Sequence, residues 1–398
     1  MPAAPGLPEL VIFDVDGTLQ DTSQWWPGVI AEGVTRYGKV IGRDLPLPDA
    51  AAANAVLGHK DEQVWGPFLP DDLRSRWKEL REVTIPLEID QLRAGRDWLF
   101  PGTRPMLREL RAAGVRLALA SNCRSRYFTA VREGQGLGEL VDAAFCLDTP
   151  GVSCKRDMVA QALAQAGTRR AVMVGDRRVD EDAATFHGIP FVLRHGPHAG
   201  EVLAPVATFA ASAELIPLLA GRGPLVRALA ERLAATRPAP GRALRVGITG
   251  PPCAGKTELV AELRPLLSGW RVAALDQCLR PRPDPALLAQ GDHLGAAFDL
   301  PRWLQTELKR DADGAPVLVE GLFLLDPRVR PHLDVVVFVD APEDQLLVRA
   351  AGRAPGLEEQ LRTRFLPAHR EFIARHPPRA LAQVQIDNAN LLRPRLLS

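Results

Sequence analysis

The sequence predicts an α/β protein with two three-layer domains, each built on a parallel sheet. Short apolar runs that end in acidic or glycine-rich motifs alternate with helical patterns in both halves of the chain, and this order builds parallel sheets covered by helices. The length of 398 residues accommodates two domains of ordinary size. A phosphate-binding motif begins only at Gly250, past the middle of the chain, so the residues before it require a domain of their own.

The composition is typical of a globular protein and excludes several classes of function. Hydrophobic residues make up 46% of the chain, charged residues 24%, and the net charge is +1, so no overall charge favours nucleic acid or an anionic membrane. No apolar run approaches the length of a membrane span, and the N-terminal residues lack the basic segment of a signal peptide. The five cysteines show no metal-site spacing. We therefore expect reduced thiols and a cytoplasmic protein.

The first apolar strand, residues 10–13, ends in two carboxylates. Asp14 and Asp16 are followed by Gly-Thr, and such a pair at the end of a strand indicates a divalent-cation site with one oxygen free to act as a nucleophile. The stretch resembles the D-x-D-G-T motif of the haloacid dehalogenase superfamily. In that superfamily the second Asp is typical of the members that transfer phosphoryl groups.

Three further stretches match the same superfamily in order. They are the strand ending at Ser121, a Lys before a helical pattern at Lys155, and the G-D-x-x-x-D stretch that contains Asp176 and Asp180. Taken alone, Ser121 and Lys155 are also compatible with a helix cap and a surface residue, but the ordered set favours the resemblance. The resemblance covers roughly residues 8–218 and implies a Rossmann-like core with a helical cap at about 21–98. A cap that closes over the site favours small substrates over polymers.

The resemblance also implies a mechanism for hydrolysing phosphate monoesters. Asp14 would attack phosphorus and form an aspartyl-phosphate, while Asp16 would protonate the leaving oxygen and then activate water. Ser121 and Lys155 would neutralise charge on the transferring group. The implied Mg²⁺ ligands are Asp14, Asp16, Asp176 and Asp180.

Residues 250–257 form the motif G-x-x-x-x-G-K-T between an apolar run, residues 244–248, and a helical pattern, residues 258–267. This is the strand–loop–helix context of a phosphate-binding loop. The backbone of the loop, including Gly250 and Gly255, would surround the phosphates of ATP. Lys256 would reach the terminal phosphates and Thr257 would bind Mg²⁺.

The chain from roughly 225 to 398 resembles the uridine kinase–phosphoribulokinase group. The stretch V-E-G-L-F-L-L contains Glu320, which the resemblance implies as a ligand of Mg²⁺ or its waters. Asp276, at the end of another apolar run, is implied as the catalytic base, and Arg349 and Arg353 as phosphate-binding arginines of a mobile segment. The alternatives are a sheet-end cap for Asp276 and a solvated helix face for the arginines.

We therefore expect a bifunctional Mg²⁺-dependent enzyme with a phosphatase domain, residues 1–221, and an ATP-dependent kinase domain, residues 222–398. Its partners would be a small phosphate ester and a small hydroxyl acceptor, nucleoside-like or sugar-like. One alternative is a polynucleotide 5′-kinase/3′-phosphatase, which pairs the same two activities. The near-neutral charge and the cap do not favour nucleic acid as a partner. A second alternative is a regulator that senses a nucleotide.

Overall fold

The computed structural model describes residues 3–4, 6–57, 59, 61–308 and 314–397. The chain separates into two compact units, one built on Pro8–Leu219 and the other on Ala220–Ser398. The division falls two residues before the position expected from the sequence. In the part of the chain that is described, no helix is both long and apolar enough to cross a membrane.

The first unit contains a six-stranded sheet in which every pairing is parallel. The strand order is β3-β2-β1-β4-β5-β6, so that β2 and β4 flank β1 and the chain reverses direction across the sheet at β1. In such sheets, ligands bind beyond the carboxyl ends of the strands at this reversal. The strands are β1 (Leu10–Phe13), β2 (Arg116–Ala120), β3 (Ala143–Phe145), β4 (Ala171–Gly175), β5 (Phe191–Arg194) and β6 (Ala207–Phe209).

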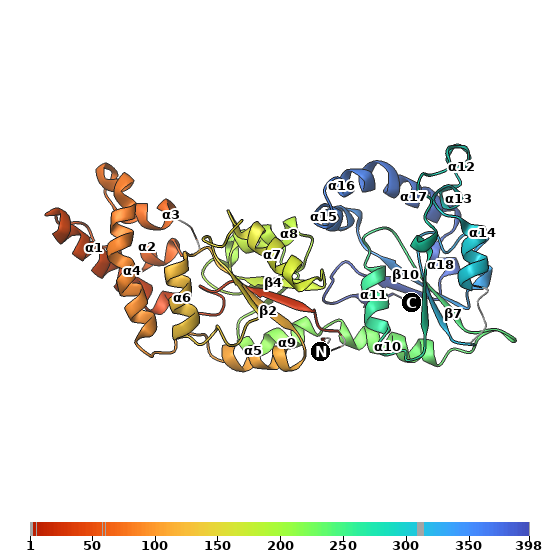
Figure 1. Cartoon of the computed structure of the whole chain (residues 1–398), viewed down its shortest axis with the longest axis horizontal. Helices are drawn as coiled ribbons and strands as arrows, with labels where there is room; N and C mark the ends of the chain where they lie inside the picture. The colour runs from red at the N-terminus through yellow and green to blue at the C-terminus, as the bar shows by residue number, and fades with distance from the viewer. Residues whose placement is uncertain (1–2, 5, 58, 60, 309–313, 398) are drawn as a thin grey trace. The chain divides into compact units, whose positions relative to one another are not determined.

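Helices cover both faces of this sheet. Figure 1 shows α7 and α8 on one side of the sheet, with α5 and α9 on the other. Buried residues of β1, β2 and β4 pack against α7 and α8 in one continuous apolar cluster. The expected Rossmann-like core with a parallel sheet is therefore confirmed. The helices are α5 (Thr103–Ala112), α6 (Ser125–Gly134), α7 (Lys155–Ala166), α8 (Arg178–Phe186) and α9 (Leu215–Leu219).

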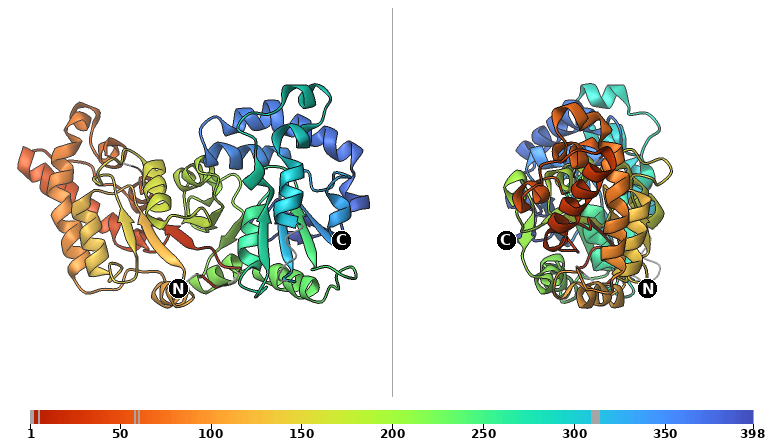
Figure 2. Two further views of the ribbon diagram at one scale, coloured as in Figure 1. Left: turned by 45° about the vertical axis from the view of Figure 1, so that its right-hand side comes forward. Right: turned by 90° about the vertical axis from the view of Figure 1, so that its left-hand side faces the viewer.

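The segment expected to form a cap is helical. Its longest helices, α1 and α4, pack side by side, and Gly33 allows this approach because a Cβ there would lie 2.1 Å from Thr84 Oγ1. Helix α4 also packs on α6, and an antiparallel bridge between Gln20 and Leu99 joins the two ends of the segment. Figures 1 and 2 show these red and orange helices beside α6. The cap helices are α1 (Trp26–Ile41), α2 (Ala50–Ala55), α3 (Glu62–Trp65) and α4 (Trp77–Arg93).

The second unit contains another six-stranded sheet, in the order β12-β11-β10-β7-β9-β8. All pairings are parallel except β11–β12, which is antiparallel. The sequence predicted only parallel strands here. Because few residues separate β11 from β12, the chain has no room for a crossover helix and must return antiparallel. The strands are β7 (Arg245–Thr249), β8 (Arg271–Ala274), β9 (Val317–Glu320), β10 (Val335–Asp340), β11 (Val384–Asp387) and β12 (Arg395–Leu396).

Apolar clusters cover both faces of the second sheet. Because side chains alternate along a strand, Val337 and Val339 pack with α10 and α11, whereas Val336 and Phe338 pack with the fully buried Trp303 of α14. The strand order reverses at β7, which places the loop after β7 at the crevice of this sheet. The helices are α10 (Gly223–Ala234), α11 (Lys256–Leu263), α12 (Pro285–Ala289), α13 (His293–Ala297), α14 (Leu300–Trp303), α15 (Glu343–Arg353), α16 (Leu357–Gln360), α17 (Leu366–Arg375) and α18 (Pro378–Leu381).

Candidate active sites

The carboxyl edge of the first sheet brings together charged residues from three motifs. Lys155 Nζ, at the start of α7, lies 2.6 Å from Asp14 Oδ1, directly after β1, and 2.8 Å from Asp180 Oδ1 in α8. The same ammonium donates a hydrogen bond to the carbonyl of Ala120 at 2.9 Å. All three charged side chains are buried. Residues far apart in the sequence therefore form one compact ionic cluster.

Three carboxylates at this edge are close enough to bind one metal ion. Asp14, Asp176 and Asp180 each offer an oxygen, and these oxygens lie within 4.8 Å of one another. Thr18 Oγ1 orients Asp176 with a hydrogen bond of 3.1 Å. Gly17, at φ 81°, leaves room for this carboxylate, since a Cβ there would lie 2.4 Å from Asp176 Oδ2. Three clustered hard oxygen ligands fit Mg²⁺.

The charge of the cluster also favours a cation. Burial raises the pKa of Asp14 to about 7, with Lys155 opposing and Asp180 reinforcing the rise. Burial likewise raises the pKa of Asp176 well above its usual range, and the neighbouring carboxylates add to the effect. Burial alone would lower the pKa of Lys155, but the two carboxylates beside it hold that pKa above its ordinary value. One ammonium thus faces three acids, and a divalent ion would offset the remaining negative charge.

Asp16 does not join this group, although the sequence predicted its carboxylate as a metal ligand. Asp16 Oδ1 accepts hydrogen bonds from Tyr127 at 2.6 Å, Thr22 at 2.5 Å and Gln20 at 3.2 Å. These donors turn the carboxylate toward the cap side of the site. Burial raises the pKa of Asp16, while Thr22 and Tyr127 act to lower it. A carboxyl group with a raised pKa beside a reacting oxygen is suited to proton transfer.

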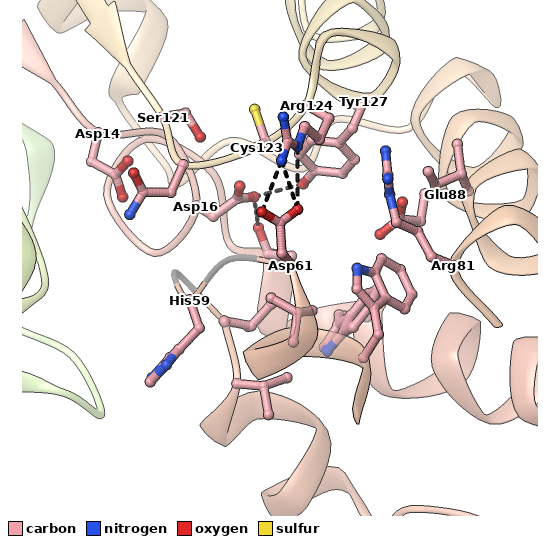
Figure 3. Close-up of a pocket in the computed structure, with 18 residues that line it drawn as sticks. Asp14, Asp16, His59, Asp61, Arg81, Glu88, Ser121, Cys123, Arg124 and Tyr127 are labelled. Atoms are coloured by element: carbon pink, nitrogen blue, oxygen red, sulfur yellow. Dashed lines mark hydrogen bonds and ion pairs between the residues drawn. The ribbon is translucent and has the colours of Figure 1, made fainter. Parts of the chain in front are cut away.

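A pocket open to solvent extends from this edge toward the cap (Figure 3). Asp14, Asp16 and Ser121 line its core side, and two tryptophans, Trp26 and Trp65, line its cap side. The residue pair Asp61 and Arg124 joins cap to core across the pocket, with the carboxylate and guanidinium 2.8 Å apart. The structure therefore places the carboxylates of Asp14 and Asp16 at one end of a cavity whose other walls include residues of the helical cap.

The glycine-rich loop of the second unit connects β7 to α11. Gly250 has φ 147°, and a Cβ there would lie 1.9 Å from the carbonyl oxygen of Val339. Gly255 has φ 95°, and a Cβ there would lie 2.4 Å from Asn388 Nδ2. Both positions therefore require glycine. Since the loop ends at the N-terminus of α11, its backbone N–H groups form the kind of site that binds phosphate.

Lys256 lies inside this loop. Its ammonium donates hydrogen bonds to the carbonyls of Gly250 at 3.2 Å and Pro251 at 2.7 Å. Burial lowers the pKa of Lys256 to about 8, although Glu320 and Asp276 act to raise it. Among the described residues, the hydrogen-bond partners of Lys256 are these two backbone carbonyls, and with a pKa of about 8 the ammonium is charged at neutral pH.

Two carboxylates face this lysine. Thr257 Oγ1 donates a hydrogen bond of 2.5 Å to Glu320 Oε1 at the end of β9, and burial raises the pKa of Glu320. Asp276 lies in the 3₁₀ helix Leu275–Cys278 directly after β8, and its side chain is exposed. The structure therefore gathers Lys256, Thr257, Glu320 and Asp276 at one edge of the second sheet.

The two arginines of α15 contact the glycine-rich loop itself. Arg349 donates hydrogen bonds to the carbonyls of Asn388 at 2.7 Å, Ala389 at 3.0 Å and Cys253 at 3.4 Å. Arg353 lies beside the Cys253 thiol and acts to lower its pKa, although burial raises that pKa overall. The guanidinium of Arg349 is thus hydrogen-bonded to backbone carbonyls, and the phosphate-binding role expected for Arg349 and Arg353 stays a prediction.

Sequence reasoning assigned no role to two residues that support these sites. Tyr127 holds Asp16, and the fully buried Asn388 donates a hydrogen bond of 2.7 Å to the carbonyl of Ala254 in the glycine-rich loop. Asn388 directly follows β11, which ends at Asp387. This position at the end of a strand is the feature of the sequence that could have marked Asn388 as a site residue. Nothing local in the sequence marks Tyr127, which lies 111 residues from its partner.

Comparisons with known proteins agree with the geometry of the first unit. A family model described as haloacid dehalogenase-like hydrolase matches residues 8–188. The tyrosine-protein kinase PtkA of Mycobacterium tuberculosis is 31% identical over 201 residues, which is 48% of this chain and 64% of that protein. This chain therefore spans less than two thirds of that relative's length.

Other relatives are matched over more of their length. Enolase-phosphatase E1 of Frankia alni is 31% identical over 217 residues, covering 48% of this chain and 88% of that protein. Phosphoglycolate phosphatase of Pseudomonas fluorescens is 24% identical over 214 residues, covering 50% of this chain and 74% of that protein. A solved structure of a haloacid dehalogenase-like protein, SP0104 from Streptococcus pneumoniae, covers 53% of this chain and 97% of its own, with 22% identity and a TM-score of 0.45. Through its first unit, the chain belongs to the haloacid dehalogenase-like hydrolases.

Proposed function

We propose that the first unit hydrolyses small phosphate monoesters through an aspartyl-phosphate. The observation that carries this proposal is the cluster of Asp14 with Lys155, Asp176 and Asp180 at the mouth of a pocket that also contains Asp16. Asp14 is the nucleophile and Lys155 limits the negative charge around it. The relatives named phosphoglycolate phosphatase and enolase-phosphatase support a small ester as substrate.

Each residue of the cluster has one task in the proposed reaction. An oxygen of Asp14 attacks phosphorus while Asp16 gives its proton to the leaving ester oxygen, which the raised pKa of Asp16 favours. Asp16 then removes a proton from the water that cleaves the aspartyl-phosphate, which regenerates both carboxyl groups. Ser121 lines the pocket where the phosphoryl group would lie and would donate a hydrogen bond to it. Mg²⁺ held by Asp14, Asp176 and Asp180 would stabilise negative charge on that group.

The phosphatase proposal is tested with Asp14→Asn and a chromogenic ester with an uncharged alcohol part, p-nitrophenyl phosphate, in the presence of Mg²⁺. We expect the wild-type chain to hydrolyse the ester and Asp14→Asn to lose all but a trace of activity. Asp182→Asn, which changes a half-exposed acid on α8, serves as the matched control and should keep full activity. Equal hydrolysis by wild type and Asp14→Asn would contradict the proposal.

We further propose that the second unit transfers the terminal phosphoryl group of ATP to a hydroxyl group of a small molecule. The observation that supports it is the glycine-rich loop with Lys256 and Thr257 at the N-terminus of α11, facing Glu320 and Asp276. Asp276 would accept the proton of the hydroxyl group, and Lys256 would contact the transferring phosphate. Thr257 and Glu320 would hold Mg²⁺, which would supply positive charge to offset the charge of the phosphates.

The kinase proposal is tested in the Asp14→Asn background, so that the first unit does not remove the product. Mg²⁺ and ATP would be supplied with a panel of nucleosides, sugars and a 5′-hydroxyl oligonucleotide, and Lys256→Ala would serve as the blank. Phosphorylation of one small hydroxyl compound is the expected result. Phosphorylation of the oligonucleotide alone would instead favour nucleic-acid end repair, and ATP binding without turnover would favour a nucleotide sensor.

A further inference from the structure

One wall of the pocket in the first unit is a single face of helix α4. Arg81, Ile85 and Glu88 line the pocket at spacings of four and three residues, which places them on one side of a helix. Figure 3 shows Arg81 and Glu88 at the end of the pocket away from Asp14 and Ser121. A phosphate ester bound at Asp14 would therefore extend its alcohol part toward these two side chains.

Glu88 is a buried acid without a partner. Its side chain is 5% exposed, and within the described part of the chain no hydrogen bond or ion pair engages its carboxyl group. Burial raises the pKa of Glu88 well above its usual range, and the proximity of Asp16 adds to this while Arg81 opposes it. A buried polar group that lacks a hydrogen-bond partner carries a free-energy cost. A ligand that supplies a hydrogen bond to this carboxyl group would recover that cost.

The other charged residues that line the pocket are already engaged. Asp16 is held by Tyr127, Asp61 pairs with Arg124, and His59 lies 2.9 Å from a guanidinium nitrogen of Arg177. Arg81, like Glu88, has no ion-pair or hydrogen-bond partner among the described residues. Much of the remaining lining is apolar, including Trp26, Val56, Leu57, Val64, Trp65 and Ile85. Arg81 and Glu88 are thus the charged groups available to a ligand.

We propose that Arg81 and Glu88 select the alcohol part of the substrate, which carries both a hydrogen-bond donor for Glu88 and an anionic group for Arg81. This inference rests on the proposed phosphatase function of the same site. A compact hydroxy acid or amino acid esterified with phosphate has this chemistry, because it offers a hydroxyl or ammonium donor together with a carboxylate. The planar guanidinium of arginine can donate two parallel hydrogen bonds to one carboxylate. The apolar side chains around the two groups lower the local dielectric and strengthen both interactions.

The test compares phosphate esters that differ in these two groups. 2-Phosphoglycolate has a carboxylate alone, phosphoethanolamine has an ammonium alone, 3-phosphoglycerate has a carboxylate with a hydroxyl, and O-phosphoserine has a carboxylate with an ammonium. We expect esters with both groups to exceed those with one group in kcat/KM by about tenfold or more, because a site built to bind a donor discriminates against ligands without it. The last two esters decide whether the donor is a hydroxyl or an ammonium.

Substitutions then assign the effect to each residue. Glu88→Leu should remove most of the preference for a donor, because it has no hydrogen-bond acceptor, and Arg81→Gln should remove most of the preference for a carboxylate. Both variants should hydrolyse p-nitrophenyl phosphate, which has neither group, within about twofold of wild type. Asp90→Asn, an exposed position on the same helix, is the matched control and should change nothing. Equal losses on all esters, or an unchanged preference, would overturn the inference.

Stability and binding measurements distinguish this inference from the proposed function. Since no hydrogen bond or ion pair engages Glu88 within the described residues, Glu88→Gln and Glu88→Leu should not lower the unfolding temperature, and a loss of stability in both would show a structural role instead. If the wild-type chain hydrolysed none of the esters, the proposed function would fail. Calorimetric binding of the same esters to Asp14→Asn would still test the pocket, with the esters that carry both groups expected to bind most tightly.

Discussion

Replacing Lys155 by Met tests the ionic cluster at the carboxyl edge of the first sheet. The ammonium of Lys155 is buried and lies 2.6 Å from Asp14 and 2.8 Å from Asp180. Met has a similar length but no charge, so the substitution leaves the clustered carboxylates without their cation. Removing one partner of a buried ion pair costs about 3–5 kcal/mol. For a domain of this size each kcal/mol moves the unfolding midpoint by about 2–4 °C, and the expected decrease is therefore about 6–20 °C.

The assay is thermal unfolding followed by tryptophan fluorescence, because five of the seven tryptophans lie in residues 1–98 and report on the first unit. The measurement without metal, in a chelator, should be made above pH 7, where the carboxyl group of Asp14, with its pKa of about 7, is ionised. Adding Mg²⁺ should raise the midpoint of Lys155→Met more than that of wild type, since a divalent ion replaces the lost positive charge.

The pH dependence of stability provides a second readout of the same cluster. Between the ordinary pKa of 3.8 and about 7, the folded protein binds more protons at Asp14 than the unfolded chain does, so stability falls as pH rises through this window. The decrease should be steeper in Lys155→Met. Lys78→Met, at an exposed position of α4, is the control. A midpoint for Lys155→Met within about 2 °C of wild type in chelator, or an equal response of both proteins to Mg²⁺, would refute the reasoning.

Three further predictions concern the glycine-rich loop, and the last two rest on the nucleotide binding proposed for the second unit. Cys253 has φ 63°, a backbone conformation that costs about 1 kcal/mol for a residue with a Cβ. Cys253→Gly should therefore raise the free energy of unfolding of the second unit by about that amount in urea titrations. Cys253→Ala keeps the Cβ and should not raise it. Asn388→Asp would lose the donor to the carbonyl of Ala254, so calorimetry should show nucleotide affinity about tenfold lower, and unchanged affinity would contradict a positioning role. Because the pKa of Lys256 is about 8, nucleotide affinity should fall as pH rises through that value, whereas a flat profile would exclude the need for a charged lysine.

The local motifs of the chain determined much of both candidate sites. The sequence predicts strands that end at Asp14, Asp176, Glu320 and the loop at Gly250. In the structure a strand ends directly before Asp14, Asp176 and Gly250, and Glu320 is the last residue of β9. This succeeds because the carboxyl ends of parallel strands share one edge of a sheet, so motifs at strand ends must converge. Positive φ at Gly250 is similarly a local backbone requirement that the sequence displays.

Only the tertiary structure decided where the longer side chains point. Asp16 lies two residues after Asp14 yet faces Tyr127, since a hydroxyl group 111 residues away provides its hydrogen bond. Arg349 contacts the backbone of the glycine-rich loop and of Asn388, whereas the sequence resemblance implied a phosphate-binding arginine and left a solvated helix face as the alternative. The lack of a partner for Glu88 is likewise a property of packing. Sequence fixes strand ends through local backbone geometry, whereas the partners of a flexible side chain depend on which distant elements the fold brings beside it.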